Sequence, residues 1–253
     1  AVKETGKWGF IDRSGNLVIP PQFNRIKPFS EGRAWGWKEG KLYLLYDTGQ
    51  IRKMPFFART VGQFRRGLAP AKLKSRFGYV DREGEWTIDP QYIYADTFNQ
   101  GQLALIQDQK GPALIDPRGK IVFRARQIDP IAFTANRTLV RGKEKWILLD
   151  EKGRQLWTGR KGSVIPPVGE GLLIWQREER FTGLNTDGEL IFETDTMTVS
   201  GYIDGMSVAR TPYNSGLLNA NGQFILPMRP GTIDAISGGI ARHSFARKFT
   251  YIT

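Results

Sequence analysis

The sequence predicts an all-β repeat protein, and three observations carry that prediction. A turn glycine recurs with successive spacings of 34, 35, 35, 34, 35 and 34 residues, at Gly15, Gly49, Gly84, Gly119, Gly153, Gly188 and Gly222. Short runs of aromatic and β-branched residues flank these glycines, as strands require. A small or aliphatic residue also recurs about every 35 residues in a further run. Self-similarity at such a period is typical of repeat proteins, in which each unit is one supersecondary element.

The turn before each glycine is predicted from a polar residue. Asp or Asn stands three residues before the glycine in six copies, at Asp12, Asp81, Asp116, Asp150, Asn185 and Asn219. Such a side chain can accept a hydrogen bond from the backbone N–H two residues on, while glycine supplies the positive φ of the turn. In the remaining copy the polar residue, Asp47, stands one place later. Because the residues recur with the turn, we interpret them as structural rather than catalytic or metal-binding.

Further strands are predicted on either side of this turn. The strand after the glycine meets proline in several copies, at Pro20, Pro55, Pro90 and Pro227, and proline lacks the N–H that a sheet ladder needs. An apolar residue then recurs and is expected to fill the core between units, at Phe29, Phe64, Phe98, Phe133 and Val168. The recurring small residue follows; this alanine line comprises Ala34, Ala69, Ala104, Leu139, Ile174, Ala209 and Ala241. Small side chains let backbones converge, so we predict an inner strand around an axis.

Three segments of the first copy carry a family resemblance: Lys-Trp-Gly-Phe-Ile-Asp at 7–12, Val-Ile-Pro-Pro-Gln-Phe at 18–23 and Phe-Ser-Glu-Gly-Arg-Ala at 29–34. They resemble the WG (KWG) β-repeat found in many bacterial proteins. Later copies drift, since Trp146 lacks the following glycine and residues 110–112 lack the aromatic. The resemblance extends over essentially the whole chain. It implies a repeat architecture and brings no catalytic residues with it.

The repeat count predicts one WG-repeat β domain over residues 1–253. About four strands per unit favour a β-propeller-like arrangement of seven units of about 35 residues plus an extra hairpin at 240–252, which either completes a unit or forms a thin eighth one. An open β superhelix is the alternative, with the hairpin as a cap.

Composition limits the possible function classes. The chain has 37 Lys and Arg against 25 Asp and Glu, a formal net charge of +12, which favours an acidic partner unless the surface is only solvated. The absence of cysteine excludes disulfides and thiolate metal sites. No apolar run approaches the roughly 20 residues of a membrane-spanning helix, so no membrane span is expected. A start at Ala1 fits a processed or a trimmed chain, and we expect a periplasmic or secreted bacterial protein.

Catalytic chemistry has little support in the sequence. His243 is the single histidine and has no cysteine or second histidine with which to build a metal or nucleophilic site, so it is expected to be a wall or surface residue. No phosphate-binding glycine loop is present, and no cofactor is expected. Carboxylate catalysis stays open as an alternative through Glu31, Glu170, Glu178 and Glu179, although nothing selects a pair.

We therefore predict a non-catalytic binding module that engages a protein partner through one face of the scaffold. The alternative is an anionic polymer, an envelope glycan or nucleic acid, bound by the same basic residues. Basic residues cluster where the alanine-line strand ends, at Lys72, Lys74, Arg76, Arg141, Lys143 and Lys145, while Arg65 and Arg66 precede such a strand and are expected on the opposite side. Trp35 and Trp37 are added as stacking surfaces, with core packing as their alternative.

Overall fold

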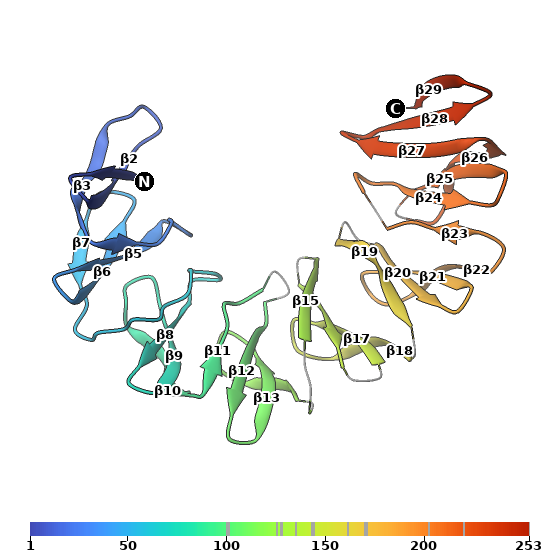
Figure 1. The fold of residues 1–253 in the computed structure, drawn as a ribbon. Coiled ribbons are helices and arrows are strands. Elements are labelled where there is room, and N and C mark those ends of the chain that lie inside the picture. Colours follow the sequence, from blue (N-terminus) through green and yellow to red (C-terminus); the bar gives the residue numbers. More distant parts are fainter. Residues whose placement is uncertain are drawn as a thin grey trace. The chain divides into compact units, whose positions relative to one another are not determined.

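The regular secondary structure of the described residues consists of β-strands in antiparallel sheets (Figure 1). The computed structural model describes residues 1–253 apart from positions 100, 101, 125, 127, 128, 135, 143, 144, 161, 170, 171, 202, 220 and 253. These residues form eight sheets, five of four strands and three of three strands. Residues 1–126 and 127–253 are two compact units, and each is described by itself. No helix in the described part of the chain has the length and apolar character needed to cross a membrane.

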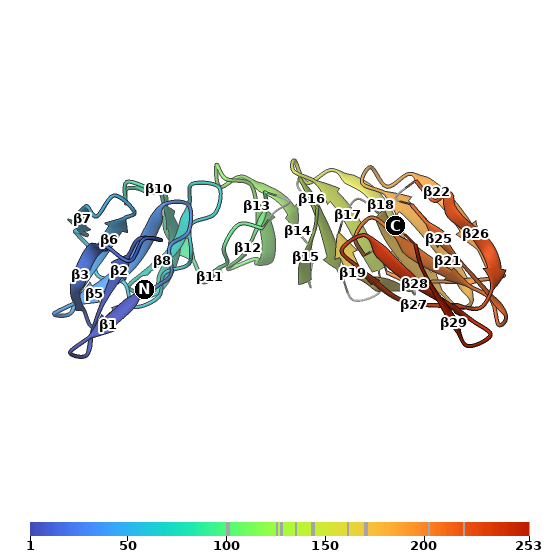
Figure 2. The ribbon, with the colours of Figure 1, turned by 90° about the horizontal axis from the view of Figure 1, so that it is seen from above.

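Unit 1 contains four sheets in chain order (Figures 1 and 2). Their strands are β1 (Val2–Glu4), β2 (Lys7–Ile11) and β3 (Leu17–Phe23); β4 (Arg25–Ile26), β5 (Arg33–Lys38), β6 (Lys41–Tyr46) and β7 (Ile51–Lys53); β8 (Ala69–Leu73), β9 (Arg76–Val80) and β10 (Trp86–Tyr92); and β11 (Tyr94–Ala95), β12 (Ala104–Asp108), β13 (Gly111–Ile115) and β14 (Ile121–Arg124).

Unit 2 also contains four sheets. Their strands are β15 (Asp129–Thr134), β16 (Arg137–Arg141), β17 (Lys145–Asp150) and β18 (Gln155–Arg160); β19 (Ser163–Gly169), β20 (Leu172–Arg177), β21 (Arg180–Asn185) and β22 (Leu190–Thr194); β23 (Thr198–Val199), β24 (Ser207–Arg210), β25 (Asn214–Leu218) and β26 (Phe224–Pro230); and β27 (Thr232–Ser237), β28 (Ile240–Phe245) and β29 (Lys248–Ile252). The extra hairpin, β28–β29, pairs with β27 and so forms an eighth sheet of its own. The predicted all-β repeat fold is confirmed, while the closure of seven units into a propeller-like ring stays a prediction.

The recurring turn has the predicted geometry. Asp12 accepts hydrogen bonds from the backbone N–H of Ser14 at 2.8 Å and of Asn16 at 2.9 Å. The same pair of bonds recurs at Asp81, Asp116, Asp150, Asn185 and Asn219. The seven turn glycines have φ between +71° and +91°, a region that side chains other than glycine rarely occupy. These polar residues are therefore structural, as the sequence predicts.

Two adjacent positions of each repeat connect successive sheets. The residue five before the turn glycine packs on the sheet that follows, as Phe10 does against Ala34 and Tyr79 against Phe98. The residue four before it packs on the sheet that precedes, as Leu45 and Ile115 do. The alanine line is buried, with at most 1% exposure at each of its seven positions. Phe64 and Phe98 are core residues as expected, whereas the side chains of Phe133 and Val168 lie outside the described residues.

The Trp-Gly pair requires glycine at its second position because the neighbouring strand leaves no room for a side chain there. A Cβ on Gly9 would lie 2.3 Å from the carbonyl oxygen of Ile19, and one on Gly78 would lie 2.3 Å from that of Ile88. The pairing register shifts at both places, where the partner strand carries proline. Because proline cannot donate to the ladder, the strand bulges toward its neighbour, and only glycine leaves room for the displaced carbonyl.

Candidate functional site

The predicted basic residues of unit 1 lie on one hairpin. We call the hairpin that joins each alanine-line strand to the next strand the exit hairpin, and the row of exit hairpins in one unit its exit edge. In the β8–β9 exit hairpin, Lys72 is partly buried with its ammonium 5.4 Å from the Phe77 ring centroid. Lys74 is exposed in the turn with φ of +54°, and Arg76 is partly buried at the start of β9. The hairpin thus presents three cations within five residues.

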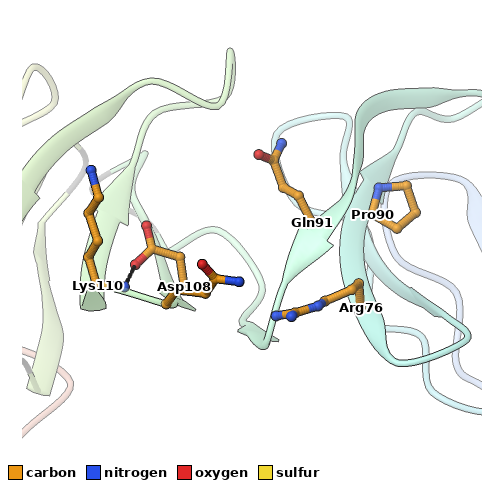
Figure 3. A pocket seen from close by; sticks show the side chains of 6 residues that line it. Arg76, Pro90, Gln91, Asp108 and Lys110 are labelled. Atoms are coloured by element: carbon orange, nitrogen blue, oxygen red, sulfur yellow. Dashed lines mark hydrogen bonds between the residues drawn. The ribbon is translucent and has the colours of Figure 1, made fainter.

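A shallow pocket of about 350 Å³ adjoins this hairpin and the next one along the chain (Figure 3). Arg76 and Gln91 reach toward it from the β8–β10 sheet, while Asp108 and Lys110 border the opposite side from the β12–β13 exit hairpin. Pro90 and Gln109 complete the lining. The pocket shows that the exit hairpins of these two consecutive sheets lie side by side.

The carboxylate in this pocket is held in its ionised form. Arg124 donates to Asp108 with both terminal nitrogens, at 3.0 and 2.6 Å, and the Lys110 backbone N–H donates at 2.8 Å. The Arg124 hydrogen bond is the main reason why the pKa of Asp108 is lowered. Asp108 is paired with Arg124, and the positive charge of Lys110 also acts on it. Because Asp108 is the only carboxylate among the lining residues, the pocket keeps an excess of positive charge from Arg76 and Lys110.

The second predicted basic group lies in unit 2. Arg141 ends β16 with its guanidinium carbon 6.0 Å from the Trp146 ring centroid, and Lys145 is exposed at the start of β17. Lys143 lies outside the described residues. The two predicted groups thus occupy exit hairpins of different units.

The use of Trp35 and Trp37 as stacking surfaces is wrong. Their exposures are 1% and 7%, and their indole N–H groups donate to the backbone carbonyls of Gly62 at 3.0 Å and Ala58 at 2.9 Å. Trp35 stacks on Phe64 inside the core that joins the second and third sheets. The alternative of core packing is correct, because buried indoles need both apolar neighbours and a hydrogen-bond acceptor and here find both.

The opposite edge of unit 1, formed by the loops before the alanine-line strands and by the recurring turns, contains a network around Glu31. Glu31 accepts the backbone N–H of Arg66 at 2.9 Å and of Gly67 at 2.8 Å, and pairs with Arg82 at 2.9 Å. Burial alone would raise the pKa of Glu31, but hydrogen bonds from Arg82 and the two backbone N–H groups lower it below its ordinary value. Arg65 and Arg66 are exposed on the loop that Glu31 holds.

Of the four carboxylates named for catalysis, the described residues place only Glu178 and Glu179 at one pocket. Glu31 has the structural role just described, and Glu170 lies outside the described residues. Glu178 and Glu179 border a separate pocket of about 540 Å³ in unit 2. Among the described residues, no group of three or more His, Cys, Asp and Glu side chains is placed to hold a metal ion. His243 is a buried wall residue rather than a surface one, with Nε2 3.0 Å from the carbonyl oxygen of Pro230.

One feature of the exit edge was missed by the sequence prediction. The first residue after the exit turn stands eight before the turn glycine and is basic in most sheets: Lys7, Lys41, Arg76, Lys145, Arg180 and, in the last sheet, Lys248. This row could have been found in the sequence by counting back eight positions from each turn glycine. It is not visible as a local cluster, because its members lie about 35 residues apart.

Comparison with known proteins agrees with the repeat pattern. The family profile of the WG containing repeat matches residues 8–36 and 77–110. No curated protein matches the chain. Among solved structures, Hsv2p of Kluyveromyces lactis is 8% identical with a TM-score of 0.43, over 83% of this chain and 85% of that one. PorZ, a bacterial surface component of the type-IX secretion system of Porphyromonas gingivalis, is 9% identical with a TM-score of 0.33, over 91% of this chain and 38% of that one. With both TM-scores below 0.5, no property of either protein is transferred to this chain.

The WG resemblance predicted from residues 7–34 is thereby confirmed over two segments, each of which begins at a Trp-Gly or Phe-Gly pair beside a proline bulge and continues into the next sheet. Residues 8–36 and 77–110 of this chain match the WG containing repeat, and they lie in an all-β repeat fold.

Proposed function

We propose that this protein is a non-catalytic interaction module that binds an acidic protein partner through the exit edge. The observation that carries the proposal is a difference in charge pairing between the two edges of unit 1. The family of β repeats supplies a scaffold, and loops or hairpins along one edge of such a scaffold are suited to recognition.

The opposite edge is largely neutralised by internal ion pairs. Arg82 pairs with Glu31 at 2.9 Å, and Arg33 lies 3.9 Å from Glu83. Arg52 pairs with Glu85 and also donates to the Glu83 carbonyl oxygen. Guanidinium groups engaged in this way are less available to a partner, because a new ion pair would have to replace an existing one.

Apart from Arg124, the cations of the exit edge form no ion pair with a described residue of unit 1. The ion pairs of unit 1, among the residues that are described, are the three of the opposite edge and Arg124 with Asp108. None of them includes Lys7, Lys41 or Arg76, which begin the strand that follows the exit hairpin in three consecutive sheets. Lys74 and Lys110 are exposed in the turns beside them. Unpaired cations along one edge attract an acidic partner and accelerate its association.

A protein partner is favoured over an anionic polymer by two features of the same edge. Glu4, Glu39 and Asp108 stand among the cations and repel any anionic chain, but a polypeptide can offset this repulsion by donating its backbone N–H groups to these carboxylates. Trp35 and Trp37 are buried, so neither of these two indoles is available as a platform on which nucleic-acid bases would stack.

The test uses poly-L-glutamate as the acidic polypeptide, with heparin and single-stranded DNA of similar charge as polymer probes. We expect polyglutamate to bind at low salt, to weaken with rising salt, and to bind at least as well as the two polymers. Tighter binding of heparin or DNA would replace the proposal by the polymer alternative. Absence of binding to all three at low ionic strength would overturn both.

A further inference from the structure

We propose that the exit edge of unit 1 recognises an acidic segment in the polyproline II conformation that carries one carboxylate every third residue. This inference rests on the proposed function and specifies the chemistry of the partner. It is argued from the period of the cations along the edge, from the apolar surface beside them, and from the pocket of Figure 3.

The cations recur once per sheet. Lys7, Lys41 and Arg76 occupy the same repeat position in three consecutive sheets, and Lys110 stands one place earlier in the fourth. These sheets pack face to face through continuous hydrophobic clusters that contain residues of both neighbours. Sheets that pack in this way lie about 10 Å apart. The edge therefore offers one cation roughly every 10 Å.

An extended peptide matches this spacing in one regular conformation. Polyproline II has three residues per turn and a rise of about 3.1 Å, so every third side chain lies on one face at intervals of about 9 Å. In a β-strand, side chains on one face repeat at about 7 Å and then at about 13 Å, and neither value fits the row.

An α-helix with an acidic residue every seventh position would also repeat at about 10 Å, and the surface beside the cations decides between the two. Trp8 and Phe77 directly follow Lys7 and Arg76 and are only partly buried. Tyr94 is 43% exposed, with its ring 6.2 Å from that of Phe77. Aromatic side chains along a groove are the usual partners of polyproline II segments, whereas an amphipathic helix needs a continuous hydrophobic groove.

The pocket between Arg76 and Lys110, the last two cations of the row, can hold one carboxylate of the peptide. Arg76 and Lys110 border it from two consecutive sheets, and about 350 Å³ is room for a side chain. Gln91 and Gln109 add neutral hydrogen-bonding groups. The nearby Asp108 carboxylate, although paired with Arg124, opposes a doubly charged phosphate more strongly than a singly charged carboxylate.

The experiment compares three fluorescein-labelled peptides of equal charge by fluorescence anisotropy at low salt. The first has four Glu-Pro-Pro triplets, the second has the same four glutamates in one block followed by eight prolines, and the third is a helical peptide with glutamate at every seventh position. We expect the triplet peptide to bind about tenfold more tightly than the block peptide, as three additional exposed ion pairs in register allow. Equal binding of these two would overturn the inference, and so would tighter binding of the helical peptide.

Matched variants separate this inference from the proposed function. Replacing Lys41→Gln and Arg76→Gln should lower the affinity of the triplet peptide to that of the block peptide. Arg13→Gln with Arg65→Gln removes the same charge from exposed residues of the opposite edge and should leave the tenfold preference intact. If polyglutamate binds and depends on the exit edge while the preference for triplets is absent, only the inference fails. If polyglutamate and all three peptides fail to bind, both fail.

Discussion

Glu31 accepts the backbone N–H of Gly67 at 2.8 Å, across 36 residues of sequence. The same carboxylate accepts the Arg66 N–H and pairs with Arg82, so one side chain ties the loop before β5 to the loop before β8 and to a turn of the third sheet. Loops of consecutive repeats are thus held together by a charge-assisted network as well as by the hydrophobic core.

Replacing Glu31→Gln should lower the free energy of unfolding at pH 7 by about 1–3 kcal/mol, since hydrogen bonds to a charged group are lost or weakened. The pKa of Glu31 is lowered in the folded state, so its contribution is present above the ordinary value of 4.5 and is lost as the pH falls through the folded-state pKa. Urea unfolding at pH 7 and at pH 3 should therefore show a difference between wild type and variant that shrinks in acid. Glu83→Gln is the control, because Glu83 is exposed and its contact with Arg33 is 3.9 Å. A difference that stays constant with pH would contradict the role of the Glu31 charge.

Tyr79→Phe should destabilise the protein by about 1 kcal/mol, because the hydroxyl donates to the Asp96 carbonyl oxygen at 2.7 Å inside the core. Burial raises the pKa of Tyr79, so the hydroxyl stays a donor at any pH at which the protein is folded. Tyr251 occupies the same repeat position in the last sheet but is 69% exposed, and Tyr251→Phe should change stability by less than about 0.5 kcal/mol. Thermal unfolding of the two variants measures both stability losses. Equal losses would show that the buried hydrogen bond of Tyr79 does not cause the destabilisation.

Gly78→Ala should cost about 3 kcal/mol, because the new Cβ would lie 2.3 Å from the Ile88 carbonyl oxygen and the backbone must move. Gly216→Ala should cost less, since the corresponding distance to the Leu226 carbonyl oxygen is 2.8 Å. Thr250 holds this repeat position in the last sheet, where no fourth strand pairs with β29, and Thr250→Ala should be nearly neutral. Chemical denaturation measures the loss of unfolding free energy for each of the three variants. A Gly78→Ala variant as stable as wild type would contradict the steric explanation of the Trp-Gly pair.

The parts of the fold that depend on local sequence were predictable. Asp12 and Gly15 specify their turn through contacts within four residues, and the alanine line marks buried positions wherever it occurs. The burial of Trp35 was not predictable, because a strand with apolar residues on both faces does not reveal which face the next sheet covers. The Glu31 network joins residues 35 and 51 positions apart, and no local pattern indicates such contacts.

The candidate site was predictable only in outline. Lys72, Lys74 and Arg76 do lie on one hairpin, as their spacing suggests. The pocket between Arg76 and Lys110 was not predictable, since it depends on how two sheets pack and on Arg124 neutralising Asp108. That the predicted group in unit 1 and the one in unit 2 act together stays a prediction.

Reversing Lys72→Glu and Lys74→Glu should cut the association of polyglutamate far more than reversing Arg65→Glu and Arg66→Glu, although both pairs change the net charge equally. Lys72 and Lys74 take part in no ion pair among the residues described in unit 1, whereas Arg65 and Arg66 lie on the edge that also carries the carboxylates Glu31, Glu83 and Glu85 and three internal ion pairs. The loss should appear chiefly as a slower on-rate at low salt and should fade at high salt, as steering by exposed charges requires. Stopped-flow or surface-based kinetics at two ionic strengths measures it, with thermal unfolding as the check that both variants fold.

Reversal of Arg141 and Lys145 in the same assay tests whether unit 2 contributes. Equal losses from the two pairs of unit 1 would show that net charge alone, and not the exit edge, explains the binding.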